Sequence, residues 1–383
     1  MPNPCDIQIE VFGKTDVGLV REHNEDNFLV ADVTASVRSS EVTEPLQVAL
    51  GEKGAVLLVC DGMGGAAAGE VASQMAVDSI YDALSLADPQ PRDGFARLLR
   101  RAVERANEKI FIQSRDNQSE RGMGTTCTVA GLVDSTLVIG QIGDSRCYVL
   151  RDGRLAQVTK DQSLAWQLIE AGAMTPEEAK AFEHANIILQ ALGVQERVEV
   201  VLSQVELRKG DVVLLCSDGL HGPVSDEEIL AVLIAEADLK KAAGALVQKA
   251  LDRDGPDNIT VVLARFDGES LKAPALEDVV TFVPYDPGSD PVPEPIGGSG
   301  PNKETLEEPI PRELLTTEDI VTKADGTPLP PVGGSGSAPA PRTPRSMMAF
   351  FFLALLAAAA GGIFVMKCER DQAARGDSRS AAP

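Results

Sequence analysis

Basic residues are scarce in this chain of 383 residues, in which 35 Lys and Arg stand against 58 Asp and Glu, for a formal net charge of -23. A protein that follows a nucleic-acid backbone needs clustered Lys and Arg to contact the phosphates. The composition therefore argues against nucleic acid as the main partner. An acidic surface favours solubility and suits basic peptide partners.

Cysteine and histidine are also few, with six Cys and three His. The cysteines lack the paired spacing of a zinc site, and three of them lie inside apolar runs as small core residues. This pattern favours a reducing compartment. His23, His184 and His221 follow no ligand spacing, so we expect them to be incidental to the chemistry.

The first ten residues lack a positive stretch followed by an apolar one, so we expect no secretory signal and a cytoplasmic N-terminal part. Residues 347–366, in contrast, are 20 residues without a charge. That length crosses a hydrocarbon core about 30 Å thick and predicts one transmembrane helix, with a buried or interfacial helix as the alternative. Four basic residues follow it and two precede it, which would place the tail (367–383) inside. We weight the missing signal more heavily and place the tail outside.

Residues 268–345 contain 15 of the 24 prolines, together with Gly, Ser and acidic residues. The near-repeat Gly-Gly-Ser-Gly occurs at 297–300 and again at 333–336. This composition predicts a disordered linker. Residues 7–267 remain as one globular domain, which is long enough for a sizeable core.

Short apolar runs alternate with helical patterns through this domain. Turns at 143–145 and 152–153 join neighbouring runs closely, which favours antiparallel meanders over strand-helix-strand crossovers. We predict an α+β fold, an α-β-β-α sandwich of two antiparallel sheets flanked by helices, plus the disordered linker and one C-terminal transmembrane helix. The predicted strands are residues 28–33, 55–60, 127–133, 137–142, 146–151, 212–216 and 259–265. The predicted helices are residues 70–84, 95–114, 163–171, 226–235 and 240–252.

Several of the apolar runs are bounded by aspartates. Asp61, Asp144 and Asp218 follow such runs, and Asp257 precedes another. A carboxylate at the end of an apolar strand is costly unless a cation or a set of donors compensates it. Oxygen ligands without a His or Cys pattern select Mg²⁺ or Mn²⁺ over zinc. The alternative for each Asp-Gly pair is a plain turn.

Six short motifs occur in the order found in the bacterial branch of the protein phosphatase 2C family, and residues 7–266 resemble these metal-dependent serine/threonine phosphatases. The motifs are REHNEDNF at 21–28, DGMGG at 61–65, GTT at 124–126, GDSR at 143–146, SDGL at 217–220 and DNIT at 257–260. The resemblance implies hydrolysis of phosphoserine and phosphothreonine in proteins by a metal-activated water. It also implies a bacterial signalling enzyme, with phosphorylated proteins and a Ser/Thr protein kinase as candidate partners. The predicted transmembrane helix and the missing secretory signal would hold this enzyme on the inner face of the membrane.

The same resemblance implies a ligand set for two Mn²⁺ or Mg²⁺ ions. Asp61 would bridge both ions and would therefore be catalytic. Asp218, Asp257 and the Gly62 carbonyl would complete the first ion. Glu25 would reach the second ion, partly through water.

Further roles follow from the resemblance. Arg21 would be catalytic by binding the phosphoryl group, because a guanidinium can hold two phosphoryl oxygens at once. Asp144 would bind a weaker third ion, although Gly222 stands where the family often has another Asp. Asp26 would orient metal-bound water without being a ligand itself, and Asn258 would likewise act from outside the ligand set.

Three further positions depart from the family pattern. Met63 stands where eukaryotic members carry a histidine proposed as general acid, so leaving-group protonation would fall to a metal-bound water. In residues 160–193, which resemble a mobile flap beside the site, Gln162 and Gln190 replace residues that are commonly His and Arg. Substrate choice or turnover is therefore expected to differ from that of relatives.

Two rival functions remain. One is a catalytically weak or inactive phosphatase-fold module that binds a phosphoprotein or a kinase. The intact set of Glu25, Asp61, Asp218 and Asp257 argues against it, because lost ligands would be its signature. The other rival is a two-metal nuclease, which the acidic charge and the missing basic groove disfavour.

Overall fold

The computed structural model describes residues 6–64, 68–179, 182, 184, 187–275 and 278–288. The predicted transmembrane helix at 347–366, the tail at 367–383 and most of the predicted linker lie outside these residues. Within the described part of the chain, no helix combines the length and the apolar character needed to cross a membrane.

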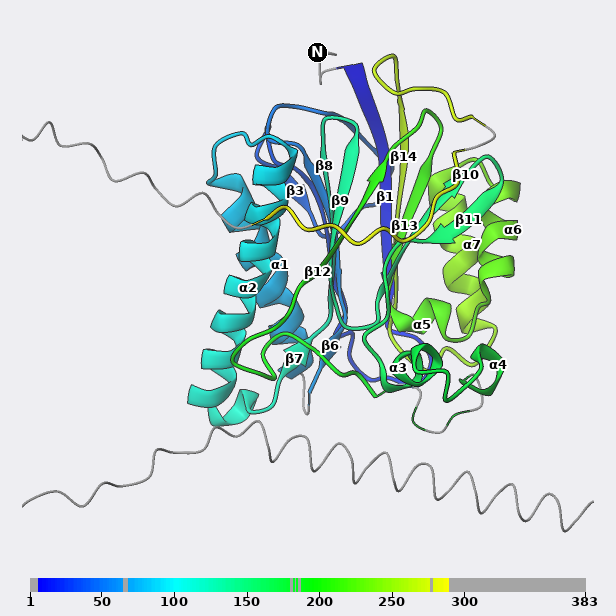
Figure 1. The fold of residues 1–383 in the computed structure, drawn as a ribbon. Helices are drawn as coiled ribbons and strands as arrows, with labels where there is room; N and C mark the ends of the chain where they lie inside the picture. The colour runs from blue at the N-terminus through cyan, green and yellow to red at the C-terminus, as the bar shows by residue number, and fades with distance from the viewer. Residues whose placement is uncertain are drawn as a thin grey trace, which may run out of the picture. The chain divides into compact units, whose positions relative to one another are not determined.

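Two antiparallel sheets of six strands each form the centre of the domain (Figure 1). The first sheet contains β1 (Ile7–Asp16), β4 (Leu46–Ala49), β10 (Arg146–Arg151), β11 (Arg154–Gln157), β13 (Val212–Cys216) and β14 (Ile259–Gly268). The second contains β2 (Asn27–Asp32), β3 (Val37–Ser39), β5 (Ala55–Cys60), β8 (Cys127–Val133), β9 (Thr136–Ile142) and β12 (Val201–Glu206). The strand orders are β11-β10-β13-β14-β1-β4 and β12-β9-β8-β5-β2-β3. A short ribbon of β6 (Gly62–Met63) and β7 (Gly124–Thr125) lies beside them.

Helices cover the outer faces of both sheets. Figure 1 shows α1 (Ala68–Ser85) and α2 (Arg92–Asp116) against the second sheet, and α6 (Asp226–Ala235) and α7 (Leu239–Leu251) against the first. Every residue of β5, β8, β9 and β13 is buried, because these strands have a sheet on one face and helices on the other. The predicted α+β fold with two antiparallel sheets and helices is confirmed.

Short helical segments lie at one end of the sandwich, the lower end in Figure 1. They are α3 (Leu164–Glu170), α4 (Pro176–Ala179) and α5 (Asp218–His221). A 3-10 turn, η2 (Gln118–Glu120), follows α2. A capping box begins α6: the Ser225 hydroxyl accepts from the Glu228 amide, and the Glu228 carboxylate accepts from the Ser225 amide.

The chain beyond β14 departs from the predicted linker boundary. Leu271 is only 4% exposed and belongs to the core. Asp278 accepts from Arg208 Nε at 2.8 Å, and the Tyr285 amide donates to the Leu202 carbonyl at 2.8 Å. We call residues 271–275 and 278–288 the C-terminal strap. It packs on the domain because β12 is an edge strand whose backbone groups need partners.

Candidate active site

The strand register brings the predicted carboxylates together at one end of the strands of both sheets. In the second sheet Asn27 pairs with Cys60, so Asp26 and Asp61 leave adjacent strands at the same end. In the first sheet Cys216 pairs with both Val261 and Arg146. Antiparallel pairing therefore places the end of β13 beside the starts of β14 and β10. Those three points are where Asp218, Asp257 and Asp144 lie.

Burial, together with mutual repulsion, disfavours the charged forms of the carboxylates in this cluster. Burial and the nearby charges of Asp26 and Asp218 raise the pKa of Asp61 well above its usual range. Burial raises the pKa of Asp26 to about 8, even though the hydroxyls of Ser217 and Thr260 donate to its Oδ2 at 2.8 and 2.7 Å. Carboxylates that disfavour one another's charge in this way favour a cation between them.

The oxygens of this cluster are suited to a hard cation. Among the described residues, Oδ1 of Asp26, of Asp144 and of Asp218 is buried and lacks a hydrogen-bond partner. A buried acceptor without a partner costs about 1 to 3 kcal/mol, which a bound ion would offset. No three acidic, His or Cys side chains of the described residues already form a closed metal cage. The carboxylates would therefore have to close around an ion.

Arg21 faces the same cluster through Asp257. Its Nη2 donates to Asp257 Oδ2 at 2.7 Å, and this hydrogen bond raises the pKa of the guanidinium. The Arg21 side chain remains 51% exposed, so it is accessible to a ligand from solvent. Asn258 holds the loop that carries Arg21 and Glu25: it accepts from the Glu25 amide at 2.8 Å and donates to the carbonyls of Val17 and His23.

Glycine is required where the start of α1 meets the loop after β5. The Gly62 amide donates to the Glu25 carbonyl at 3.2 Å. A Cβ on Gly62 would lie 2.3 Å from the Gly69 carbonyl oxygen, and a Cβ on Gly69 would lie 2.8 Å from Glu25 Oε2. Sequence reasoning identified Gly62 but missed Gly69, whose only signal is a glycine directly before the predicted helix at 70–84.

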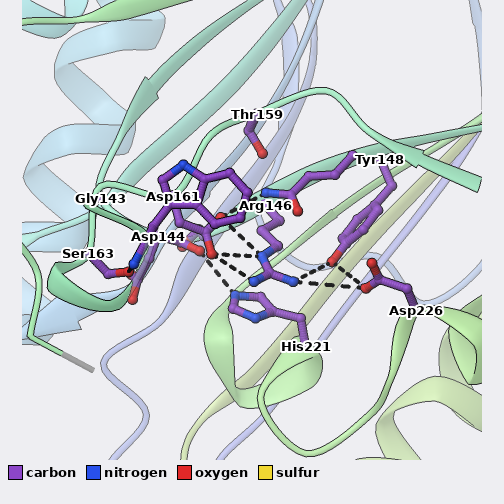
Figure 2. A network of polar contacts seen from close by, with 12 residues as sticks. Gly143, Asp144, Arg146, Tyr148, Thr159, Asp161, Ser163, His221 and Asp226 are labelled. Carbon is purple, nitrogen blue, oxygen red and sulfur yellow. Dashed lines mark hydrogen bonds and ion pairs between the residues drawn. The ribbon is translucent and has the colours of Figure 1, made fainter. Parts of the chain in front are cut away.

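A polar network holds the turn that carries Asp144 (Figure 2). Arg146 donates to both oxygens of Asp161, with Nη2 at 2.7 Å from Oδ2, and its Nη1 donates to the Tyr148 hydroxyl at 2.9 Å. That hydroxyl donates in turn to Asp226 at 2.9 Å. The network joins the β9–β10 turn to the start of α6.

His221 was expected to be incidental, yet it is part of this support. Its Nε2 lies 3.0 Å from the Asp144 carbonyl oxygen, which only accepts, so Nε2 carries the proton. Burial lowers the pKa of the imidazole to about 3, so the ring is neutral. His23 and His184 are exposed. A sequence signal existed: His221 lies three residues after Asp218, on the same short helix.

Gln162 fixes the base of the predicted flap to the Asp144 turn. Its amide donates to the Gly143 carbonyl at 2.9 Å, and its Oε1 accepts from the Gly143 amide at 2.9 Å. Gln190, at the other end of the flap, accepts from the Glu199 amide at 2.8 Å. The two glutamines that depart from the family pattern therefore anchor the flap.

Residues 44–253 match the family model described as protein phosphatase 2C, and this match covers more than half of the chain. The chain belongs to the protein phosphatase 2C family. It is 35% identical over 255 residues to the serine/threonine phosphatase stp of Listeria monocytogenes, covering 66% of this chain and 94% of that relative. It is 40% identical over 251 residues to the serine/threonine protein phosphatase PstP of Mycobacterium tuberculosis, covering 66% of this chain and 44% of PstP. The chain thus matches less than half the length of its mycobacterial relative.

Solved structures agree with this family. The crystal structure of the M. tuberculosis phosphatase PstP/Ppp superposes with a TM-score of 0.58 at 38% identity, covering 68% of this chain and 99% of that one. The PstP catalytic domain in complex with two manganese ions gives 0.57 at 37% identity, with the same coverage. The predicted family and the enzyme class of this protein phosphatase 2C domain are confirmed.

Proposed function

We propose that the chain hydrolyses phosphoserine and phosphothreonine in proteins and depends on Mn²⁺ or Mg²⁺. The observation that carries this proposal is the convergence of buried and half-buried carboxylates with one accessible guanidinium at the same end of the two sheets. The residues concerned are Glu25, Asp61, Asp144, Asp218, Asp257 and Arg21.

The residues present suit a two-ion site like the manganese pair in the PstP structure. Asp61 would lie between the ions, with Asp218, Asp257, Glu25 and the Gly62 carbonyl as the other ligands. When bound, such ions supply an activated water and positive charge beside the phosphoryl group. A third ion at Asp144 would bind more weakly, since Gly222 offers no carboxylate.

The protein's own groups would orient the substrate and the ligands. Arg21 would turn part of its donor fork from Asp257 to two phosphoryl oxygens, where its charge opposes the charge that develops in the reaction. Ser217 and Thr260 fix one oxygen of Asp26, which leaves its other oxygen directed to the cluster. Gly222 has a structural reason to lack a side chain: a Cβ there would lie 2.8 Å from the Asp218 carbonyl oxygen.

We also propose that the chain is anchored at the cell inner membrane, with its phosphatase domain in the cytoplasm. The support is the 20-residue uncharged stretch at 347–366, joined to the domain by a Pro-rich linker. A periplasm-active reporter fused after Pro383 should be active. A silent reporter on a stable, membrane-bound fusion would overturn this topology. Phosphorylated proteins and a Ser/Thr protein kinase of the same membrane are the proposed partners.

A p-nitrophenyl phosphate assay with and without Mn²⁺ tests the proposed activity. We expect Mn²⁺-dependent hydrolysis that falls more than tenfold, or over about 1.4 kcal/mol, in Asp61→Asn. The matched control is Asp152→Asn, which changes another Asp-Gly turn that is exposed and outside the cluster. Phosphoprotein binding without hydrolysis would favour the inactive module, and cleavage of DNA would favour the nuclease.

A further inference from the structure

Two apolar side chains stand in solvent directly beside the phosphate-binding arginine. Leu19 is 67% exposed and Val20 is 66% exposed, and both immediately precede Arg21. Single exposed apolar residues are ordinary on a protein surface. Two in succession directly before Arg21 place an apolar surface beside the group that we propose binds the phosphoryl group.

The loop that carries these side chains is held in place by several hydrogen bonds. The Leu19 amide donates to the Gly255 carbonyl at 2.9 Å, and the Gly18 amide donates to Asp16 Oδ1 at 3.0 Å. A Cβ on Gly18 would lie 2.2 Å from the Asp257 carbonyl oxygen, so the loop packs tightly against the segment that carries Asp257. Leu19 and Val20 are therefore presented at a fixed place relative to Arg21, at little further loss of entropy on binding.

Acidic residues lie close in sequence to this apolar pair and to its hydrogen-bond partner. Glu22 follows Arg21, and Asp252 and Asp254 lie close in sequence to Gly255, the hydrogen-bond partner of Leu19; all three are exposed. The nearby cation Arg253 is bonded to the Glu228 carboxylate. A ligand that covers the apolar pair therefore meets negative charge at its edge, which favours basic residues in that ligand.

We propose that Leu19 and Val20 form an apolar shelf that selects phosphoprotein segments with an apolar side chain beside the phosphoresidue and basic residues further along. The selection rests on the proposed function, because Arg21 would hold the phosphoryl group while the shelf binds the neighbouring side chain. Covering the shelf removes apolar surface from water, which gives a preference for Leu over Ser at that position.

The test uses the double variant Leu19→Ser with Val20→Ser in the full chain, loaded with Mn²⁺. Its substrates are phosphothreonine peptides that differ only in having Leu or Ser on either side of the phosphothreonine, each followed by Lys. Wild type should prefer the best Leu peptide by roughly tenfold in kcat/KM, and the double variant should lose this preference. Hydrolysis of p-nitrophenyl phosphate should be unchanged, since that substrate has no flanking residue. Leu86→Ser, at a residue 86% exposed, is the matched control and should keep the preference.

Three outcomes would overturn the shelf. The first is a wild type that does not distinguish the Leu from the Ser peptides, and the second is a double variant that keeps the preference. The third is a double variant that loses p-nitrophenyl phosphate hydrolysis, which would mean that the loop only supports Arg21.

Replacing the Lys of the Leu peptide by Glu should also lower kcat/KM several-fold at low salt and less at high salt. An equal rate for both peptides would contradict the acidic edge. Failure of the proposed function is distinguishable, because wild type would then not hydrolyse p-nitrophenyl phosphate at all.

Discussion

Arg21 and Asp257 form an ion pair of 2.7 Å between Nη2 and Oδ2, although 236 residues separate them in the chain. The pair joins the proposed phosphate-binding group to a proposed metal ligand. Asp257 thus orients the guanidinium toward the cluster before any substrate binds. A pair at this exposure contributes little to stability, about 0 to 1 kcal/mol, so its value lies in orientation.

Replacing Arg21 should therefore impair turnover without unfolding the domain. For Arg21→Ala we expect kcat/KM on phosphopeptides to fall by roughly 10 to 1000-fold, and for Arg21→Lys a partial recovery, because an ammonium lacks the planar fork. The matched control is Arg38→Ala, which removes an ion pair of the same length to Asp78 on a similarly exposed surface. Steady-state kinetics of the three variants measure the difference. Equal kinetics for Arg21→Ala and Arg38→Ala would make Arg21 an ordinary surface residue.

The buried carboxylates predict how stability depends on pH. Burial raises the pKa of Asp26 and of Asp144 to about 8, from 3.8. A carboxyl with a raised pKa in the folded state contributes stability at low pH and loses it as pH rises through the folded pKa. His221, with its pKa lowered to about 3 from 6.5, acts in the opposite sense, but only below pH 6.5. Above that value only the carboxylates act.

In EDTA, the free energy of unfolding should therefore fall by about 2 kcal/mol for each of the two carboxyls, or about 4 kcal/mol in all, between about pH 6.5 and 8.5. Excess Mn²⁺ should remove this fall, because a cation favours the charged carboxylates. Asp144→Asn cannot titrate in this range and should show a smaller fall. Urea unfolding at several pH values measures all three, and a flat profile in EDTA would rule out the strained carboxylate cluster.

The C-terminal strap should contribute to stability. Truncation after Asp267 would remove buried Leu271, the partner of Arg208 and the backbone bond to β12. We expect this form to be about 3 kcal/mol less stable than one truncated after Gly288, with a Tm lower by roughly 5 to 10 °C. Leu271→Ala in the longer form should account for part of the loss. If calorimetry gave both truncated forms the same Tm, residues 268–288 would belong to the linker and would not stabilise the domain.

The sequence predicted the elements that are apolar throughout. Residues 55–60 and 212–216 were placed correctly, because a run buried on both faces is apolar at every position. β1 and β12 were missed. Gln8 and Glu10 interrupt β1, and Ser203 and Gln204 interrupt β12. These segments become strands through distant partners, since β1 lies between β14 and β4 and β12 lies between β9 and the strap.

The same distinction applies to the site. Its carboxylates lie in short motifs that the sequence displays directly. Their supporting residues do not, because Ser217 and Thr260 contact Asp26 from positions about 200 residues away in the chain, and His221 contacts the Asp144 carbonyl from a position 77 residues away. Such contacts follow from strand register, which no local pattern specifies.

Gln162 allows a last prediction, about the flap. In Gln162→Ala the Gly143 amide loses its acceptor, while the main-chain bond from residue 162 to the Gly143 carbonyl can remain. One lost hydrogen bond corresponds to about 1 kcal/mol, so the flap base and the Asp144 turn should loosen and KM for phosphopeptides should rise about fivefold. The Mn²⁺ concentration for half-maximal activity should rise together with KM, since Asp144 lies in that turn.

Gln190→Ala, which loses a hydrogen bond to Glu199 at the exposed end of the flap, should raise KM without changing the Mn²⁺ requirement. If both variants left the Mn²⁺ dependence unchanged, the flap base and the Asp144 turn would not be coupled.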